Sequence, residues 1–189
     1  SGSRWLSGND SYYHLKMARL LPELGFIHEL PWLHWTIFRD AFVSHHHGFH
    51  VLLAPFAWAS ERLTGDCLLG GKVFAILAMG AVTALVIVVL RQLDVRHRLW
   101  WVLLLGILPA HFWLRMSYVR APLVALPLML TAVLLIMRNR PLLLALLGFA
   151  FAQVYGGSVL FPLVPAAFIA GHLLAGSLPV EQNPLALVG

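Results

Sequence analysis

A run of 24 residues from Cys67 to Leu90 contains a single charged side chain, Lys72, and it constrains the fold more than any other feature. A helix that crosses the hydrocarbon core of a bilayer needs about 20 mostly apolar residues. The whole chain is 60% hydrophobic and only 11% charged, whereas about a quarter of the residues are charged in an ordinary soluble domain. We therefore expect an all-α integral membrane protein.

Further apolar stretches predict a polytopic transmembrane helical bundle. Residues 99–114 and 121–137 form two shorter apolar segments separated by a polar hinge. Residues 141–175 contain no Asp, Glu, Lys or Arg, and this segment is too long for one spanning helix. Gly156-Gly157-Ser158, near its middle, predicts a turn. Together with the long run described above, the sequence predicts five spans.

The distribution of charge predicts an orientation. Residues 1–66 hold six of the eight acidic residues and seven of the ten histidines. Basic residues flank the first and third short turns of the bundle, at Arg91, Arg96, Arg98, Arg138 and Arg140. Because cytoplasmic loops carry an excess of Lys and Arg, both turns should face the cytoplasm. We expect residues 1–66 to be an extracytoplasmic loop, residues 67–177 the membrane domain and residues 178–189 a tail.

We expect this membrane to be the bacterial inner membrane. The net charge is +5, but the basic residues are scattered at the ends of loops and do not form a stripe. Nucleic acid is therefore not an expected partner. Within the loop of residues 1–66, residues 9–21 predict a helix along the membrane interface. Its capping residues would be Asn9, Asp10 or Ser11, and its apolar face would comprise Tyr13, Met17, Leu20 and Leu24. Residues 49–58 predict either a helix dipping into the interface or a bent entry to the long span.

Asp10 and His14 stand four residues apart at the start of the first predicted helix. This spacing puts a carboxylate and an imidazole on one face of the helix, within reach of a common ligand. A divalent metal there would need further oxygen or nitrogen ligands from elsewhere. The alternative is that Asp10 caps the helix and His14 is a polar residue at the interface.

A second group of histidines forms the segment His45-His46-His47-Gly48-Phe49-His50. His46 and His50 are again four residues apart, and neutral imidazoles at this spacing are good ligands for zinc, copper or nickel. Three other interpretations stay open. The histidines could pack against lipid headgroups, donate hydrogen bonds to a phosphate, or act as general acids and bases, since their charge changes near neutral pH.

Arg115 and Arg120 bracket a short segment between two predicted spans. Burying a guanidinium group between two membrane spans costs free energy unless the group is paired or reaches the membrane surface. If both face the side of Asp10, they could clamp a phosphate or pyrophosphate; otherwise they are ordinary helix-end charges. The sequence contains no phosphate-binding glycine loop, dinucleotide turn, serine nucleophile elbow or His-Glu-x-x-His helix. Chemistry with a soluble cofactor therefore has no support.

Two motifs resemble a known family. The first is Gly8-Asn9-Asp10-Ser11-Tyr12-Tyr13-His14-Leu15, and the second is the histidine-rich turn that runs into residues 49–56. Their order, followed by a long span and short hairpins, is similar to the amino-terminal half of a GT-C membrane glycosyltransferase. The oligosaccharyltransferase catalytic subunits are the nearest likeness, and protein O-mannosyltransferases have a similar layout. The resemblance implies transfer of a sugar from a polyprenyl-phosphate carrier outside the cytoplasm.

Carried over residue by residue, Asp10 matches the acid of the first loop in that family, and Tyr12, Tyr13 and His14 match the aromatic-histidine tail of its motif. His46 or His47 matches the histidine at the end of the loop. The chain departs from the family in lacking a span before this loop, later spans and a soluble carboxy-terminal domain. Residues 115–120 also lack the paired acids that complete the metal site. We therefore expect either a fragment or a relative that works differently.

The expected function is that of a membrane glycosyltransferase, or a piece of one, using a polyprenyl-phosphate sugar donor. Catalysis is assigned to Asp10 and His14. Substrate binding is assigned to Tyr13, Lys16, His46, His47, Arg115 and Arg120. A divalent metal, Mg²⁺ or Mn²⁺, is assigned to Asp10, His14, His46 and His50. The expected partners are membrane lipid, the donor and other membrane subunits. The main alternative is a non-catalytic structural subunit of a larger complex, and a weaker one is a histidine-based metal carrier.

Overall fold

The computed structural model describes residues 6, 8–107 and 110–176, and the predicted tail of residues 178–189 lies outside them. All regular elements of the described part are helical, which confirms the all-α prediction. In chain order they are α1 (Asn9–Leu24), the 3-10 helix η1 (Ile37–Arg39), α2 (His47–Thr64), α3 (Leu68–Gln92), α4 (Arg98–Leu105), α5 (Ala110–Met116), α6 (Pro122–Met137), α7 (Pro141–Val154) and α8 (Leu160–Gly176).

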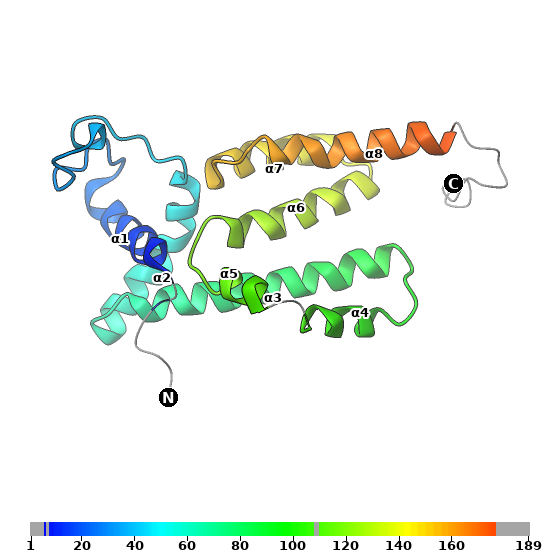
Figure 1. Cartoon of the computed structure of the whole chain (residues 1–189), viewed down its shortest axis with the longest axis horizontal. Helices are drawn as coiled ribbons and strands as arrows, with labels where there is room; N and C mark the ends of the chain where they lie inside the picture. The colour runs from blue at the N-terminus through cyan, green and yellow to red at the C-terminus, as the bar shows by residue number, and fades with distance from the viewer. Residues whose placement is uncertain (1–5, 7, 108–109, 177–189) are drawn as a thin grey trace.

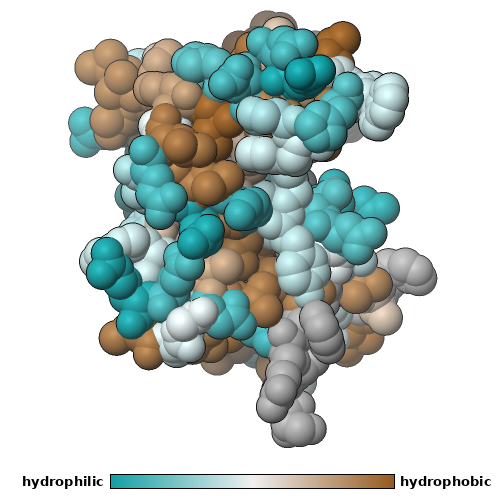
Figure 2. Space-filling model, turned by 90° about the vertical axis from the view of Figure 1, so that its left-hand side faces the viewer, coloured by the Kyte–Doolittle hydropathy of each residue, from teal (hydrophilic) through white to brown (hydrophobic). Residues whose placement is uncertain are grey.

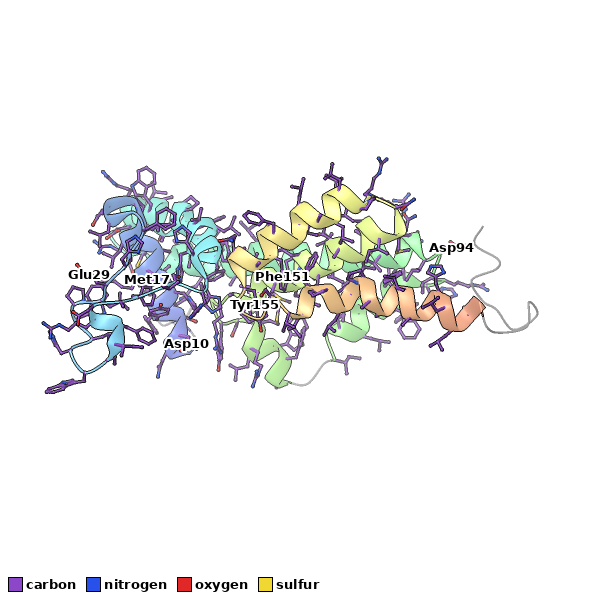
Figure 3. All side chains as sticks on the ribbon, turned by 90° about the horizontal axis from the view of Figure 1, so that it is seen from above. Asp10, Met17, Glu29, Asp94, Phe151 and Tyr155 are labelled. Atoms are coloured by element: carbon purple, nitrogen blue, oxygen red, sulfur yellow. The ribbon has the colours of Figure 1, made fainter. Side chains whose placement is uncertain are left out.

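The helices form an elongated assembly (Figure 1). One end is formed by residues 8–66 with α1, η1 and α2, and we call it the head. Helices α1 and α2 pack on each other, and α2 packs on the start of α3. Helix α6 packs against α3 on one side and against α7 and α8 on the other. The loops at residues 93–97 and 138–140 both lie at the end away from α1 and α2. Figure 3 accordingly shows Asp94 far from Asp10, with Tyr155 between them.

Within the described residues, α3 is the one helix that is both long enough and apolar enough to cross a membrane. Its 25 residues extend about 37 Å at 1.5 Å per residue, against a hydrocarbon core of about 30 Å. Only 17% of its most apolar window is buried inside the protein, so α3 is not an ordinary core helix. Helices α6, α7 and α8 are apolar but shorter, with 16, 14 and 17 residues. Spanning by these three stays a prediction.

The predicted span over residues 99–114 is wrong as a single helix. The structure instead has α4, which ends at Leu105, and α5, which begins at Ala110. The sequence between them contains Gly106 and Pro109, the two residue types that are least favourable in a helix interior. In contrast, the predicted turn at residues 156–158 is confirmed, because α7 ends at Val154 and α8 begins at Leu160.

Helix α1 forms where it was predicted, but its cap and its buried face differ. The N-cap is Gly8, and no side chain caps the helix, so the predicted caps are wrong. The side-chain oxygen of Ser11 instead accepts a hydrogen bond from the Val119 N–H at 3.0 Å. The buried side chains are Ser11, His14, Leu15, Met17 and Ala18. Of the predicted apolar face only Met17 is buried, because α1 packs on α2 through the face that carries His14, Leu15 and Ala18, while Tyr13 is exposed.

Helix α2 is a separate helix that ends at the left-handed residue Gly65, so residues 49–58 are not continuous with the long span. A close approach joins α2 to α3 at Gly70. A Cβ atom at this position would lie 2.1 Å from the carbonyl oxygen of Phe56. Only glycine fits this contact, since any side chain would push the two backbones apart.

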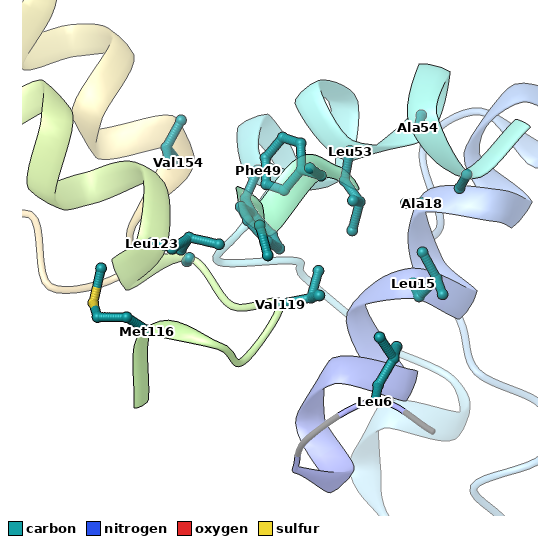
Figure 4. Packing of buried hydrophobic residues seen from close by; sticks show 14 residues of the cluster. Leu6, Leu15, Ala18, Phe49, Leu53, Ala54, Met116, Val119, Leu123 and Val154 are labelled. Atoms are coloured by element: carbon teal, nitrogen blue, oxygen red, sulfur yellow. The ribbon is translucent and has the colours of Figure 1, made fainter. Parts of the chain in front are cut away.

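The main core lies under the head, where α1, α2, α3 and the segment before α6 meet (Figure 4). Its fully buried members include Leu15 of α1, Phe49 and Leu53 of α2, and Val119. Figure 4 shows Val119 between Leu15 and Leu123 of α6. Burying one such side chain stabilises the fold by about 1.5–3 kcal/mol. This core therefore fixes the segment around Val119 against the head.

Apolar side chains also cover much of the outer surface. On α8, Leu163, Ile169, Leu173 and Leu174 are all more than half exposed. Outward apolar surface of this extent is unusual for a soluble monomer and fits hydrocarbon better than water. The head end differs, because polar and apolar side chains are mixed there (Figure 2). The chain is thus compatible with association with a membrane.

Candidate functional site

Five polar residues converge at the head, and we call them the Asp10 cluster: Asp10, His14, His46, His50 and Arg120. They come from three segments that are distant in sequence: the first half of α1, the start of α2 and the loop between α5 and α6. Contacts between α1 and α2, and the core around Val119, hold these segments together. All five residues were predicted site residues, but the pairing of Asp10 with Arg120 and of His14 with His50 was not predicted.

The first contact of the cluster is an ion pair between Asp10 and Arg120. The Arg120 Nη2 atom lies 2.7 Å from the Asp10 Oδ2 atom, and the two side chains are 41% and 56% exposed. The loop carrying Arg120 is held in place by the hydrogen bond from Val119 to Ser11. In addition, the Tyr118 ring lies against Gly8, where a Cβ atom would lie 3.3 Å from it. Asp10 therefore presents a carboxylate at the surface, already beside a cation.

The second contact joins two buried imidazoles. The His14 Nδ1 atom lies 2.9 Å from the His50 Nε2 atom, and the Ser44 hydroxyl lies 3.2 Å from the other ring nitrogen of His50. His14 and His50 are 6% and 2% exposed, respectively. One of the two facing nitrogens must donate and the other accept, so the pair forms an ordered chain that ends at Ser44.

Burial determines the charge state of this pair. Desolvation lowers the pKa of His14 to about 4, with His46 and Arg120 lowering it further and Asp10 opposing the shift. Desolvation also lowers the pKa of His50 to about 3, helped by the neighbouring His14, His46 and His47. Charging an imidazole out of water is costly. Both rings are therefore neutral near pH 7, and each can donate one hydrogen bond and accept another.

His46 links the cluster to the end of α7. Its Nδ1 atom lies 3.3 Å from the Val154 carbonyl oxygen, its ring meets that of His14 edge-on at 5.5 Å between centroids, and it stacks on Tyr155. Burial also lowers the pKa of His46. This approach requires Gly48, where a Cβ atom would lie 2.9 Å from the backbone oxygen of Gln153.

The other proposed site residues fall into two groups. Tyr13 borders the cluster, because its ring meets His14 edge-on at 5.1 Å, and burial raises the pKa of its hydroxyl. Lys16 is exposed and lies two residues after His14, so it leaves α1 in another direction. His47 stacks on Phe26 at 4.4 Å between centroids. Arg115 is exposed at the end of α5. The last three residues lie outside the cluster.

The predicted metal ligands do not form a ready coordination site. Among the residues that the structure describes, no group of three or more His, Cys, Asp or Glu side chains is placed to hold a metal ion. The Asp10 carboxylate faces Arg120, and the facing nitrogens of His14 and His50 are occupied by each other. The residues present therefore do not fit a divalent cation without rearrangement, and metal binding stays a prediction.

Sequence reasoning missed two hydroxyl groups of the site. Ser44 extends the chain of imidazoles, and Ser11, considered only as a helix cap, holds the backbone beside Arg120. The sequence did not predict either contact, because each depends on how two distant segments pack. The 3.6-residue period of α1 places Ser11 on the same face as His14, which was the one available signal.

No protein-family model, curated protein sequence or solved structure matches this chain.

Proposed function

We propose that the chain is a polytopic integral membrane protein of the GT-C glycosyltransferase type, or a part of one, which transfers a sugar from a polyprenyl-phosphate donor. The observation that carries the proposal is the Asp10 cluster. A surface carboxylate and three histidines, on the segments that resemble the first loop of that family, meet there with the Arg120 guanidinium, which comes from the loop between α5 and α6. Acceptor activation and phosphate binding need groups of these kinds.

A membrane location agrees with the shape and charge of the molecule. Helix α3 is long enough to cross a bilayer, and α8 presents apolar side chains outward. The arginine-bearing loops at residues 93–97 and 138–140 lie opposite the head. By the positive-inside rule, these loops are cytoplasmic and the head is extracytoplasmic. We place the protein in the bacterial inner membrane.

In the proposed reaction, Asp10 is the general base that takes a proton from the acceptor. A half-exposed ion pair contributes only about 0–1 kcal/mol to stability. Asp10 and Arg120 can therefore separate at a small cost in free energy, and each can then bind a group of the substrate. Arg120 then binds the donor phosphate as negative charge develops on it. The neutral His14, four residues after Asp10 on α1, orients the acceptor or the carrier phosphate.

The remaining assignments concern binding. Tyr13 and His46 border the cluster and orient the substrates. Lys16, His47 and Arg115 lie outside the Asp10 cluster and contact more distant parts of the donor or acceptor. A divalent cation, Mg²⁺ or Mn²⁺, would have to take Asp10 from Arg120, and no step of the proposal depends on it.

The test is sugar transfer from a lipid-linked donor by the complete protein carrying Asp10→Asn. We expect transfer to fall by about 10²–10⁴-fold, the usual contribution of a general base. The matched control is Asp40→Asn, which removes another carboxylate of the head, 84% exposed and 3.6 Å from Arg39. Transfer at the wild-type rate by the Asp10 variant would remove this residue from the mechanism.

A non-catalytic structural subunit is the second candidate. The outward apolar residues of α8 favour it, since they could equally contact helices of another subunit. Purification in mild detergent separates the two proposals. A stoichiometric complex that binds no lipid-linked sugar would support the structural role, whereas a lone chain that binds the donor would support the enzyme.

A further inference from the structure

A cavity lies away from the Asp10 cluster, among the C-terminal halves of α6 and α8 and the start of α7. Its volume is about 330 Å³, at the lower end of the range of about 300–1,000 Å³ that is usual for small-molecule sites. Its walls are mainly apolar and include Leu135, Leu144, Phe168 and Ile169. A space of this size and lining fits part of an alkyl chain better than a polar metabolite.

Polar and basic residues also line this open cavity. Asn139, Arg140 and His172 line it together with the apolar residues, and Arg138 stands two positions before Arg140 in the same loop. Helix α7 begins at Pro141, which is itself a lining residue, so the positive end of the helix dipole also lies beside the cavity. The cavity therefore combines mainly apolar walls with groups that favour an anion.

The surrounding surface has the same sign of charge. Arg91, Arg96 and Arg98 lie at the same end of the molecule (Figure 1). Among the described residues, Asp94 is the only acid at this end, and no ion pair is formed by the five arginines in or beside the two loops: Arg91, Arg96, Arg98, Arg138 and Arg140. Trp100 and Trp101 follow directly and are 69% and 56% exposed. Tryptophan prefers the level of the lipid headgroups.

We propose that this cavity is a binding site for an anionic phospholipid of the cytoplasmic leaflet. One acyl chain lies along Leu144, Phe168 and Ile169, and the phosphate contacts Arg138 and Arg140. Basic pockets between membrane helices on the cytoplasmic side bind acidic headgroups in this way. The inference rests on the membrane placement proposed above and is independent of sugar transfer.

The test uses the full chain purified in a neutral detergent. Native mass spectrometry counts the bound lipids after addition of phosphatidylglycerol or phosphatidylcholine with identical chains, and thermal unfolding records the stabilisation by each. We expect phosphatidylglycerol to bind preferentially. In Arg138→Gln/Arg140→Gln the affinity should fall by roughly 20-fold at low salt, since each basic residue near a membrane surface contributes about fivefold. The matched control, Arg39→Gln/Arg62→Gln, removes two arginines of the head and should keep the preference.

A second variant tests the acyl chain. Ile169 is 61% exposed and lines the cavity, so Ile169→Trp fills the space without disturbing the core, and it should also abolish the preference. The proposal is overturned if the two lipids bind equally, if either variant retains the preference, if inorganic phosphate alone stabilises as well, or if a protein subunit is bound in place of lipid. If the wild-type chain prefers phosphatidylglycerol but transfers no sugar, only the glycosyltransferase proposal is contradicted.

Discussion

The Arg120 guanidinium lies 2.7 Å from the Asp10 carboxylate. Asp10 belongs to α1 and Arg120 to the loop between α5 and α6, so the long helix α3 separates the two residues in the sequence. Among the described residues, Asp10 and Arg120 form an ion pair only with each other. The pair is half exposed, so solvent and substrate can reach both groups. Its importance should therefore appear in activity and hardly at all in stability.

The first prediction concerns Arg120→Gln. We expect the free energy of unfolding to change by no more than about 1 kcal/mol, because the ion pair is exposed to solvent. Transfer from the lipid-linked donor should fall by about 10²–10³-fold if the guanidinium stabilises the departing phosphate. Arg120→Lys should recover part of this loss. The control Arg39→Gln, at an exposed pair in the same head, should leave transfer unchanged, and equal losses in both variants would contradict the proposed role.

The second prediction concerns stability against pH. The pKa values of His14 and His50 fall on folding to about 4 and about 3, from about 6.5 in the unfolded chain. Above pH 6.5 neither state is protonated, and the stability is complete. As the pH falls from 6.5 towards 4, His14 and His50 bind protons in the unfolded chain but not in the folded chain, so stability is lost. The loss is at most about 1.4 kcal/mol per pH unit for each histidine.

The measurement for this pH dependence is thermal unfolding in detergent between pH 7.5 and pH 4. The double variant His14→Asn/His50→Gln keeps an amide near each facing nitrogen and should flatten the profile. His34→Gln removes an exposed imidazole outside the pair and should reproduce the wild-type profile. A double variant with the wild-type slope would show that other groups cause the acid sensitivity.

The third prediction compares two glycines of α3. Gly70→Ala would put a Cβ atom 2.1 Å from the Phe56 oxygen, whereas no atom lies within 4 Å of a Cβ at Gly80. Overpacking of a tight contact typically costs 1–3 kcal/mol and occasionally more, so Gly70→Ala should lower the unfolding midpoint strongly. Gly80→Ala should raise it slightly, by up to about 1 kcal/mol, because alanine is the better helix former. Similar midpoints for both variants would refute the close contact.

The fourth prediction concerns divalent cations. A cation at the head must compete with Arg120 for the Asp10 carboxylate. We therefore expect Mn²⁺ to bind weakly to the wild-type chain and more tightly to Arg120→Gln, because removing the guanidinium frees the carboxylate and reduces the local positive charge. The binding is measured by electron paramagnetic resonance of free Mn²⁺. Asp10→Asn should show no gain, and a gain there would place the ion elsewhere.

Much of the helical content could be predicted from the sequence. The apolar run that became α3, and the two helices separated by the turn at residues 156–158, follow from local composition and from glycine as a helix breaker. Helix α1 was also located, because the 3.6-residue pattern and the residues around Asp10 are local signals. These features depend on neighbours in the sequence, which is why they were found.

The contacts of the site could not be predicted in the same way. Ser11 was expected to cap α1, but it binds the backbone of Val119. Asp10 was another proposed cap, but it pairs with Arg120. Both side chains can satisfy a nearby N–H group in an isolated helix, and tertiary packing offered better partners. Likewise, the helical spacing of His46 and His50 suggested that they share a ligand, whereas the buried partner of His50 is His14.

The absence of a side chain at Gly70 has a mechanical consequence. The backbones of α2 and α3 are in direct contact at this point, and the rings of Phe49 and Phe56 pack on Phe74 beside it. A larger residue at position 70 would therefore separate the two helices and displace the start of α2, which carries His50, from α1 and His14.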